Sequence, residues 1–283
     1  MNSTTEINHE KLMELFGNVF NDVAGSMAIM MSYLGDQTGV YRAMDKLGPA
    51  SVEEIAKESN VDERYLLEWL SSNSGRGYVT YHDDEEKFSL SPEQAAVFAR
   101  ENEPTCIQGL VQGVVGQFVK EDIAVDVFQT GRGRPWGEHH ECCFCGTERF
   151  FRPAYAGHLL DEWIPAMEGV EDKLKKGAKV ADIGCGLGTS SMLMAEQYPN
   201  STIHAFDFHG PSIDEAKKRA AEKGLDNLEF FVSDAAAIPN ESYDLACIFD
   251  AWHDMGDPVG VAKSIKDTLA DDGTFMVVEP MAL

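Results

Sequence analysis

The segment Val180-Ala-Asp-Ile-Gly-Cys-Gly-Leu-Gly188 is the most informative part of the sequence for the fold. Its apolar start predicts a short buried strand that delivers Asp182, and its glycines predict a tight turn that lets the backbone approach a ligand closely. A helix is expected to open near Thr189, where the first backbone N–H groups have no partner within the helix. The stretch therefore predicts a strand–turn–helix unit that binds a nucleotide-like molecule.

The sequence downstream continues the alternation of strand and helix. Helical segments are expected at 188–198, 212–223 and 257–270. Short apolar runs, each long enough for one strand, occur at 180–183, 202–206, 228–232, 245–249 and 274–278. Strands that alternate with helices form a parallel sheet that is covered on both faces. We therefore expect an α/β domain over 176–283.

The spacing of the turn residues narrows the class of ligand. A dinucleotide fingerprint, G-x-G-x-x-G, would need glycine where Thr189 stands, which disfavours an NAD-linked oxidoreductase. A phosphate-binding loop would need a Gly-Lys-Ser/Thr ending, which this turn lacks. The pattern present, D-x-G-x-G-x-G, resembles the first motif of class I S-adenosylmethionine (SAM)-dependent methyltransferases. The resemblance implies that SAM binds here, with S-adenosyl-L-homocysteine as product, and that the turn contacts it through Asp182, Gly184, Cys185, Gly186 and Gly188.

Two further carboxylates follow predicted strands, at the edge where ligands bind in an open α/β sheet. Asp207 is a candidate acceptor for both ribose hydroxyls, with Phe208 packing on the adenine. Asp234, followed by Ala235, is a candidate acceptor for the adenine amino group. A single Asp at such a place is as readily a turn or helix-cap residue. Three carboxylates in this order favour one shared nucleoside site.

The segment Phe249-Asp-Ala-Trp-His-Asp-Met-Gly256 follows the fourth predicted strand. It resembles the O-methyltransferase group, whose members place a His-Asp pair here. The resemblance implies that His253 is the general base for an acceptor hydroxyl, with Asp254 beside it and Asp250 near the methionine end of SAM. An ordinary histidine pKa suits that role. The alternative is a histidine that caps the next helix or bonds the backbone.

The first hundred residues predict a mostly helical, winged-helix-like domain. A capping box at Ser51 opens a short helix, a second helix turns Tyr65, Leu66, Trp69 and Leu70 inward, and a hairpin follows at 78–90. DNA binding is the first hypothesis for this order. However, residues 51–100 hold eleven Asp or Glu against five Lys or Arg, whereas a recognition helix should be basic. The charge therefore favours a dimerisation and substrate-lid platform.

Before that module, apolar side chains recur at three- and four-residue spacing and predict a buried helical stripe. Core packing is the favoured interpretation of the Met-rich continuation at Met27, Met30 and Met31, with a dimer partner or a substrate channel as alternatives. The residues of the stripe are Leu12, Leu15, Phe16, Val19, Phe20, Val23 and Met27.

Residues 101–175 are expected to form a helical linker and substrate lid, with helices over 104–128 and 147–169 and a Gly- and Pro-rich loop over 130–137. The segment Glu138-His-His-Glu-Cys-Cys-Phe-Cys145 has soft-metal ligands. A loop with free thiols and no metal is the favoured interpretation. Aromatic residues are candidates either to line the acceptor pocket or to fill the core: Trp136, Phe150, Phe151, Tyr155 and Trp252.

The whole chain resembles bacterial and archaeal SAM-dependent methyltransferases with an N-terminal winged-helix domain. The likeness is carried by Trp136–His140, Gly146–Pro153, Asp182–Gly188 and Trp252–Pro258. It implies a homodimer formed through the first domain and a small-molecule acceptor. Sheets of this family have seven strands, and this chain stops at Leu283, so a Rossmann-like sheet without the last two strands is expected. The alternative function is a non-catalytic, SAM- or ligand-sensing winged-helix regulator.

Bulk composition limits the partners and the cellular location that we expect for the chain. The 283-residue chain has a net charge of -25, which disfavours nucleic-acid backbones and anionic membranes as partners. No apolar run is long enough to span a membrane, and the N-terminus has no secretory signal pattern. Six cysteines without an export signal suit free thiols in a reducing, cytoplasmic setting.

Overall fold

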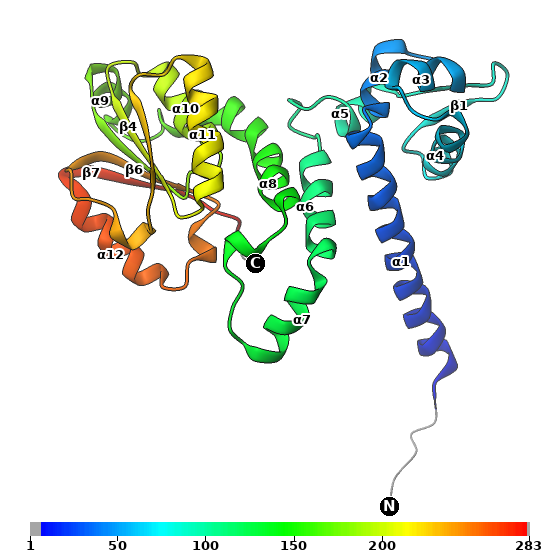
Figure 1. Cartoon of the computed structure of the whole chain (residues 1–283), viewed down its shortest axis with the longest axis horizontal. Coiled ribbons are helices and arrows are strands. Elements are labelled where there is room, and N and C mark those ends of the chain that lie inside the picture. Colours follow the sequence, from blue (N-terminus) through cyan, green and yellow to red (C-terminus); the bar gives the residue numbers. More distant parts are fainter. Residues whose placement is uncertain (1–6, 282–283) are drawn as a thin grey trace, which may run out of the picture. The chain divides into compact units, whose positions relative to one another are not determined.

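The computed structural model describes residues 7–281 and divides the chain into two compact units, Met1–Glu121 and Asp122–Leu283 (Figure 1). The first unit begins with the long helix α1 (His9–Gln37). It continues through α2 (Val40–Leu47), α3 (Val52–Ser59), α4 (Glu63–Gly75), β1 (Thr80–His82), β2 (Lys87–Ser89), α5 (Pro92–Phe98) and α6 (Gln108–Val119). This is the expected order of a helix-turn-helix followed by a hairpin.

Local signals in the sequence place these helices. Ser51 caps α3 in the predicted capping box with Glu54, and the Asp62 side chain accepts the N–H of Tyr65 at the start of α4. The strands β1 and β2 pair antiparallel, so the predicted wing is confirmed. A small core lies beneath, built from Tyr41, Met44, Ile55, Leu66, Trp69, Leu70, Phe88 and Phe98.

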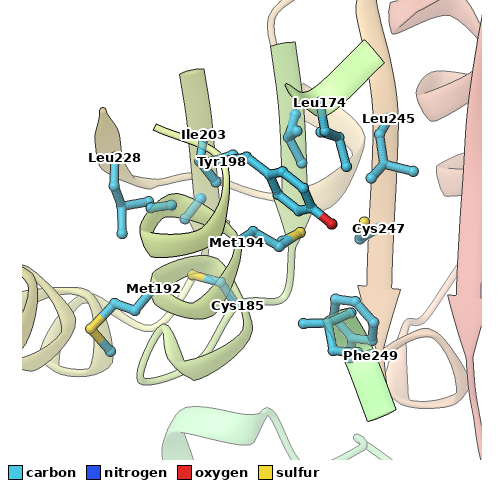
Figure 2. Close-up of a cluster of buried hydrophobic side chains, with 14 of the residues drawn as sticks. Leu174, Cys185, Met192, Met194, Tyr198, Ile203, Leu228, Leu245, Cys247 and Phe249 are labelled. Atoms are coloured by element: carbon cyan, nitrogen blue, oxygen red, sulfur yellow. The ribbon is translucent and has the colours of Figure 1, made fainter. Parts of the chain in front are cut away.

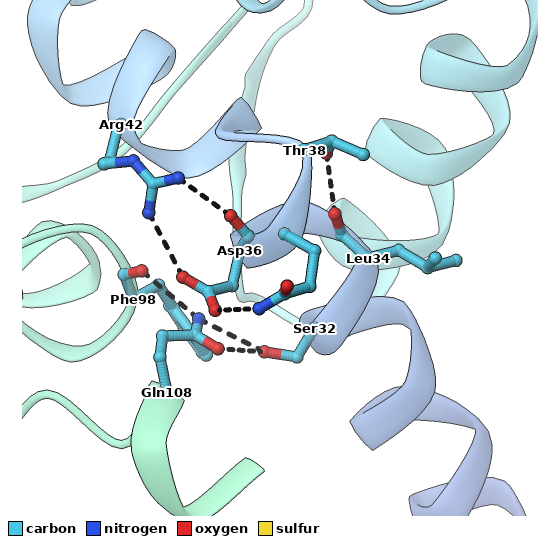
Figure 3. A network of polar contacts seen from close by, with 8 residues as sticks. Ser32, Leu34, Asp36, Thr38, Arg42, Phe98 and Gln108 are labelled. Atoms are coloured by element: carbon cyan, nitrogen blue, oxygen red, sulfur yellow. Dashed lines mark hydrogen bonds and ion pairs between the residues drawn. The ribbon is translucent and has the colours of Figure 1, made fainter. Parts of the chain in front are cut away.

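The C-terminal part of α1 is fixed in this unit by a polar network (Figure 3). The Asp36 carboxylate, 3% exposed, accepts from the Arg42 guanidinium at 3.2 Å. Ser32 and Gln108 exchange hydrogen bonds at 3.4–3.5 Å, and the Gln108 amide also donates to the Phe98 carbonyl. Because buried polar groups need partners, this network joins α1 firmly to α2 and α6.

The predicted burial of the α1 stripe is wrong for the single chain. All seven residues, from Leu12 at 44% to Phe20 at 63%, are exposed. The buried residues of α1 are Ala28, Ser32, Gly35 and Asp36. Periodicity identifies an apolar face but does not say what covers it. Tyr65 is also misassigned, since it is 80% exposed while Leu66, Trp69 and Leu70 are buried.

The second unit holds a helical lead and the α/β domain. The lead comprises α7 (Glu121–Thr130), the 3₁₀ turn η1 (Trp136–Glu138), α8 (Glu141–Ala154), the π-helix η2 (Tyr155–Trp163) and α9 (Val170–Lys176). The single helix expected over 104–128 is wrong, because Lys120 leaves helical geometry (φ −115°, ψ 37°) and separates α6 from α7. Cys142, Cys143 and Cys145 lie in the first turns of α8 and not in a loop.

The α/β domain follows in strict alternation. Its elements are β3 (Lys179–Ile183), α10 (Thr189–Gln197), β4 (Thr202–Asp207), α11 (Gly210–Lys223), β5 (Leu228–Val232), η3 (Ala235–Ala237), β6 (Tyr243–Phe249), η4 (Trp252–Asp254), α12 (Pro258–Thr268) and β7 (Leu269–Val278). The sheet order is β5-β4-β3-β6-β7, with every neighbouring pair parallel. The five-stranded Rossmann-like sheet is therefore confirmed, and its chain order reverses between β3 and β6.

Alternating side chains build a core on each face of the sheet. On one face, Val180, Leu245 and Cys247 pack with Met194 of α10 and Leu174 of α9 (Figure 2). On the other face, a second core forms around α12, with Ala181, Ile183, Ala246, Ile248, Val261 and Ile265. The helices thus fix all strand ends at one edge, where the site is built. Across residues 7–281, none of the helices has the length and apolar character needed to span a membrane.

Candidate functional site

A cavity of about 960 Å³ lies at the carboxyl ends of the strands in the second unit. Its walls include Ile183 after β3, Phe206 and Asp207 at the end of β4, Ser233 after β5, and Phe249 at the end of β6. The reversal of strand order between β3 and β6 leaves a crevice there because the connections leave in opposite directions. The cavity has the size and position of a ligand site in an α/β sheet.

The glycine turn that follows β3 forms one wall of this cavity. Gly184, Gly186 and Gly188 all have positive φ (72°, 53° and 78°), a conformation that glycine adopts without strain. A Cβ atom at Gly184 would stand 2.7 Å from Ala251, and one at Gly188 would stand 2.7 Å from the Phe230 ring. The turn is therefore built for close backbone approach, and Gly188 supports it from behind without bordering the cavity.

Asp182 does not face the cavity. It is fully buried beneath the turn, where its Oδ2 accepts the hydroxyls of Ser190 (2.7 Å) and Ser191 (2.5 Å). Burial raises the pKa of Asp182 to about 6, although both serine hydrogen bonds oppose that rise. The predicted direct contact with a ligand is thus replaced by a supporting position, in which Asp182 ties β3 to the first turn of α10.

Asp207 does border the cavity and holds the turn in place. Its Oδ2 accepts the Gly186 N–H at 2.9 Å, and its Oδ1 accepts the His209 N–H at 2.8 Å. A carboxylate offers about four acceptor positions, so each oxygen retains one for a ligand hydroxyl. A nearly buried carboxylate of this kind, 7% exposed, is oriented before a ligand arrives.

The next strand ends supply the remaining predicted nucleoside residues. Phe208, 53% exposed, and Asp234 both line the cavity, together with Ala235. The Asp234 Oδ1 accepts the Ala236 N–H at 2.8 Å and so caps η3. Asp234 is therefore a helix-cap residue that also borders the cavity.

The turn after β6 carries the candidate catalytic residues. His253 and Asp254 line the cavity, as does Asp250, whose backbone has the left-handed φ of 50°. The His253 Nδ1 lies 2.5 Å from Glu279 Oε2, and its Nε2 lies 3.5 Å from Asp254 Oδ1. Since Glu279 Oε1 also accepts the N–H groups of Ala251 and Trp252, at 3.0 and 2.6 Å, one carboxylate holds the whole turn.

The carboxylates around the turn after β6 shift the pKa values of His253 and Asp250. Partial burial lowers the pKa of His253, but the hydrogen bond to Glu279 and the carboxylates of Asp254 and Asp250 outweigh it, so the net shift is upward. Burial raises the pKa of Asp250 to about 6, with Glu279 and Asp254 adding to the rise and His253 opposing it. His253 is thus a stronger base than an ordinary histidine, and its Nδ1–H tautomer is favoured by Glu279.

Sequence reasoning missed Glu279. It stands one residue beyond β7, and β7 pairs with β6 so that Val278 lies opposite Phe249. That register brings Glu279 level with the turn at 250–253. The strand order could have identified Glu279 from the sequence. Once β7, the fifth strand of the domain, is placed beside β6, the residue after β7 must lie next to the residues after β6.

The segment 134–155 forms the wall opposite the sheet. Trp136, Phe151 and Tyr155 line the cavity, whereas the other two candidates, Phe150 and Trp252, do not. Glu148 fixes this wall to the sheet domain, because its Oε1 accepts the Thr189 hydroxyl at 2.7 Å at the start of α10. A two-point ion pair with Arg152, at 2.6 and 2.8 Å, holds the same carboxylate.

Within residues 7–281, one group has the geometry to offer three ligand atoms to a metal, Asp250 with His253 and Glu279. Two of these residues are already joined by the hydrogen bond between His253 Nδ1 and Glu279 Oε2. The His139–Cys145 segment forms no such group among the described residues, although Cys142 and Cys145 have C-x₂-C spacing. These cysteines lie on α8, and Cys142 and Cys143 are buried. Burial raises the pKa of the Cys143 and Cys145 thiols, which disfavours thiolate ligands.

Comparison with known proteins places both units. Residues 25–100 match the Rv2258c-like winged HTH domain, and residues 174–283 match a methyltransferase domain. The chain is 32% identical over 108 residues to the aklanonic acid methyltransferase DauC of Streptomyces sp. (strain C5), covering 37% of this chain and 49% of that protein. It is 33% identical over 105 residues to a ubiquinone biosynthesis O-methyltransferase of Actinobacillus pleuropneumoniae, covering 35% and 44%. The chain thus spans about half the length of the curated relatives it matches.

Solved structures share the fold over nearly the whole chain. The mitomycin 7-O-methyltransferase MmcR has a TM-score of 0.70 at 15% identity, covering 98% of this chain and 83% of that one. Human N-acetylserotonin methyltransferase in complex with SAM has a TM-score of 0.64 at 14% identity, covering 98% and 81%. The expected arrangement, a winged-helix domain followed by a methyltransferase domain, is confirmed.

Proposed function

We propose that this chain, a winged-helix domain joined to a methyltransferase domain, transfers a methyl group from SAM to a hydroxyl of a small molecule, with His253 as the general base. One observation carries the proposal. The glycine turn, the carboxylates Asp207 and Asp234, and the His253 ring all border one cavity at the carboxyl end of the sheet. Donor recognition and proton removal are therefore brought to the same place.

The residues present fit SAM by their chemistry. A Cβ at Gly186 would meet nothing within 4 Å, so the turn leaves open space there, as a closely held ligand requires. Asp207 keeps acceptor positions for ribose hydroxyls, and Phe208 and Asp234 offer an aromatic face and an acceptor for the adenine. Asp250, which also lines the cavity, suits the cationic methionine end.

Bound SAM would supply a methyl group on a positively charged sulfur, which leaves as a neutral thioether. The chain's own residues prepare the acceptor. Glu279 keeps the proton of His253 on Nδ1, so Nε2 retains a lone pair, which takes the proton of an acceptor hydroxyl. Asp254, 3.5 Å from Nε2, then stabilises the imidazolium. Holding the two reactants in line accounts for much of the acceleration expected of such a site.

The wall formed by 134–155 limits the entry of water. Trp136, Phe144, Phe151 and Tyr155 present apolar surface to the cavity. An apolar wall strengthens the interactions between charges inside the cavity, and it keeps water from competing with the acceptor hydroxyl. These features support a small, largely apolar acceptor.

The exposed stripe on α1 supports a homodimer through the first unit. A helix with seven large apolar residues, each more than two-fifths exposed, is costly in water. Because the polar network at Ser32 and Asp36 fixes only the C-terminal part of α1 in its own unit, the remainder is available to a second copy. The stripe residues Phe16 and Phe20, whose rings stack 6.1 Å apart, would lie at the centre of this contact.

The surface of α4 does not favour the regulator alternative. This second helix of the helix-turn-helix exposes Glu63 and Glu68, and Glu68 pairs with Arg64, the one basic residue of α4. Such a surface repels a phosphate backbone. The wing module therefore serves assembly better than DNA recognition.

The proposed function is tested by transfer of labelled methyl groups from SAM to a panel of small hydroxylated compounds. We expect product with the wild type and a loss of about 10²- to 10⁴-fold in kcat for His253→Ala, the range of general-base catalysis. SAM affinity should stay unchanged, because the ring lies on the acceptor side. Unchanged turnover in this variant would remove His253 from the mechanism.

A further inference from the structure

One polar side chain on the cavity wall has no hydrogen-bond partner within residues 7–281. Tyr155, the first residue of η2, is 9% exposed and lines the cavity. None of the residues that the structure describes forms a hydrogen bond with its hydroxyl group. Buried hydroxyl groups normally have a partner, because losing the hydrogen bond to water costs free energy. The Tyr155 hydroxyl is therefore suited to bind a molecule in the cavity.

Three aromatic neighbours hold the Tyr155 ring in place. Its centroid lies 5.5 Å from the ring of Phe249, 6.1 Å from that of Phe151 and 6.3 Å from that of Trp163. The ring belongs to the core cluster on one face of the sheet. A side chain packed in this way has little freedom to change rotamer. The hydroxyl thus keeps one position on the cavity wall before a ligand binds.

The helix that carries Tyr155 is anchored beside the glycine turn. The helix α8 continues into η2 at Tyr155, whose backbone is helical (φ −62°, ψ −45°). Glu148, Phe151 and Tyr155 recur at three- and four-residue spacing and present one helical face to the cavity. The Glu148 carboxylate accepts the hydroxyl of Thr189, the residue that follows the turn, at 2.7 Å. The position of Tyr155 over the strand ends is therefore fixed.

The strand order places Tyr155 at one end of a bound methyl donor. This step rests on the proposed function, in which the adenine lies at Asp234 after β5 and the ribose at Asp207 at the end of β4. The sheet order β5-β4-β3-β6 then directs the methionine part of SAM past the glycine turn toward the end of β6. Tyr155 contacts Phe249, the last residue of β6. Its hydroxyl therefore lies at the methionine end.

The charges that line the cavity leave the methionine carboxylate in need of a donor. Acidic lining residues match the ammonium and sulfonium groups of SAM and repel its carboxylate. Within the described part of the chain, Arg134 is the only lysine or arginine of the lining, and it already takes part in an interaction. A neutral O–H group attracts a carboxylate without repelling the cationic groups beside it. The acidic lining residues are Glu148, Asp207, Asp234, Asp250, Asp254 and Asp257.

The Tyr155 hydroxyl keeps its proton at any pH at which the protein works. Burial raises the pKa of the Tyr155 hydroxyl, and the charges of Asp250 and Asp182 raise it further. The group is therefore a permanent donor. A hydrogen bond from a hydroxyl to a carboxylate is also among the stronger kinds found in proteins.

We propose that Tyr155 is a donor-binding residue, whose hydroxyl donates a hydrogen bond to the methionine carboxylate of SAM. The contact fixes the end of the donor that lies farthest from the adenine. It is made equally to the product, S-adenosyl-L-homocysteine, which keeps the same carboxylate. An analogue without that carboxylate gains nothing from the hydroxyl.

The test is calorimetric titration of the full chain with two ligands. One is S-adenosyl-L-homocysteine, and the other is S-adenosyl-3-thiopropylamine, which keeps the ammonium group but lacks the carboxylate. Tyr155→Phe should weaken binding of S-adenosyl-L-homocysteine by at least about tenfold, the usual effect of losing a hydrogen bond to a charged group. Binding of the thiopropylamine should be unchanged. The phenylalanine ring keeps the contacts with Phe249, Phe151 and Trp163, so the variant should fold.

Tyr198→Phe is the matched control. The Tyr198 hydroxyl also lacks a partner among the described residues, but it is buried in the core, where it points toward Cys247 (Figure 2), and it does not line the cavity. This variant should leave the affinity for both ligands unchanged.

The proposal is overturned if Tyr155→Phe keeps the affinity for S-adenosyl-L-homocysteine or weakens both ligands equally, since equal weakening indicates a purely structural role. The same loss in Tyr198→Phe would also overturn it. Absence of S-adenosyl-L-homocysteine binding to the wild type would instead overturn the proposed function itself, so the two failures are distinguishable.

Discussion

The substitution Glu279→Gln tests whether Glu279, which sequence analysis did not identify, controls the tautomer of His253. Glu279 accepts three hydrogen bonds: two from the backbone at Ala251 and Trp252 through Oε1, and one from His253 Nδ1 through Oε2. A glutamine keeps one oxygen, which the two backbone N–H donors should retain. Its NH₂ group would then face Nδ1 and donate to it, so the proton of the neutral ring would move to Nε2.

This exchange of tautomer would leave the cavity side of His253 without a lone pair. The expected loss is therefore that of the whole general base, about 10²- to 10⁴-fold in kcat. The turn should remain folded, because both backbone hydrogen bonds survive. In the double variant with His253→Ala, no further loss is expected, since Glu279 acts through His253 and the two effects cannot add.

The assay is the pH dependence of methyl transfer. A general base works when neutral, so the wild-type rate should rise as pH passes through the pKa of His253, which lies above its ordinary value. Removing the Glu279 charge should lower that pKa in the variant. Glu229→Gln, on an exposed position of β5, is the control and should match the wild type. A Glu279→Gln variant within threefold of wild-type kcat, or losses that add in the double variant, would show that Glu279 does not act through the tautomer of His253.

Three other outcomes are expected. Gly188→Ala should lower the free energy of unfolding by about 2–4 kcal/mol in urea titrations, because its φ is positive and its Cβ would meet the Phe230 ring; unchanged stability would contradict the turn geometry. Phe16→Asp with Phe20→Asp should convert a dimer to a monomer in sedimentation, and an unchanged mass would reject the α1 interface. The raised pKa of Asp182, about 6, means that its ionisation opposes folding, so this part of the stability is lost as pH rises toward and through 6. Asp182→Asn should escape that loss, and its stability relative to wild type should grow by about 1 kcal/mol from pH 5 to pH 8; a constant difference would argue against it.

The sheet could be predicted from sequence because its signals are local. Apolar runs of strand length alternate with helical segments, and the carboxyl ends of parallel strands must meet at one edge. That shared edge was enough to predict that Asp207, Asp234 and His253 lie close together, and all three border one cavity. Glu279 required a further step, because its partner His253 is 26 residues away and only the pairing of β7 with β6 joins them.

Burial was harder to predict than secondary structure. Asp182 follows the ligand-binding pattern, yet the two serines that open α10 take its oxygen beneath the turn. The α1 stripe has helical periodicity, but periodicity does not distinguish a face covered by the same chain from one left for a partner. The π-helix Tyr155–Trp163 has no simple sequence signal, because it depends on how the segment packs against α10 and β6.

SAM binding by the glycine turn is tested by calorimetric titration of the purified chain with SAM and, separately, with NADH. We expect saturable binding of SAM at one site per chain and no heat from NADH. Asp207→Asn should weaken SAM binding, because Asp207 both holds the Gly186 turn and borders the cavity. Binding of NADH without binding of SAM would contradict SAM binding by this turn.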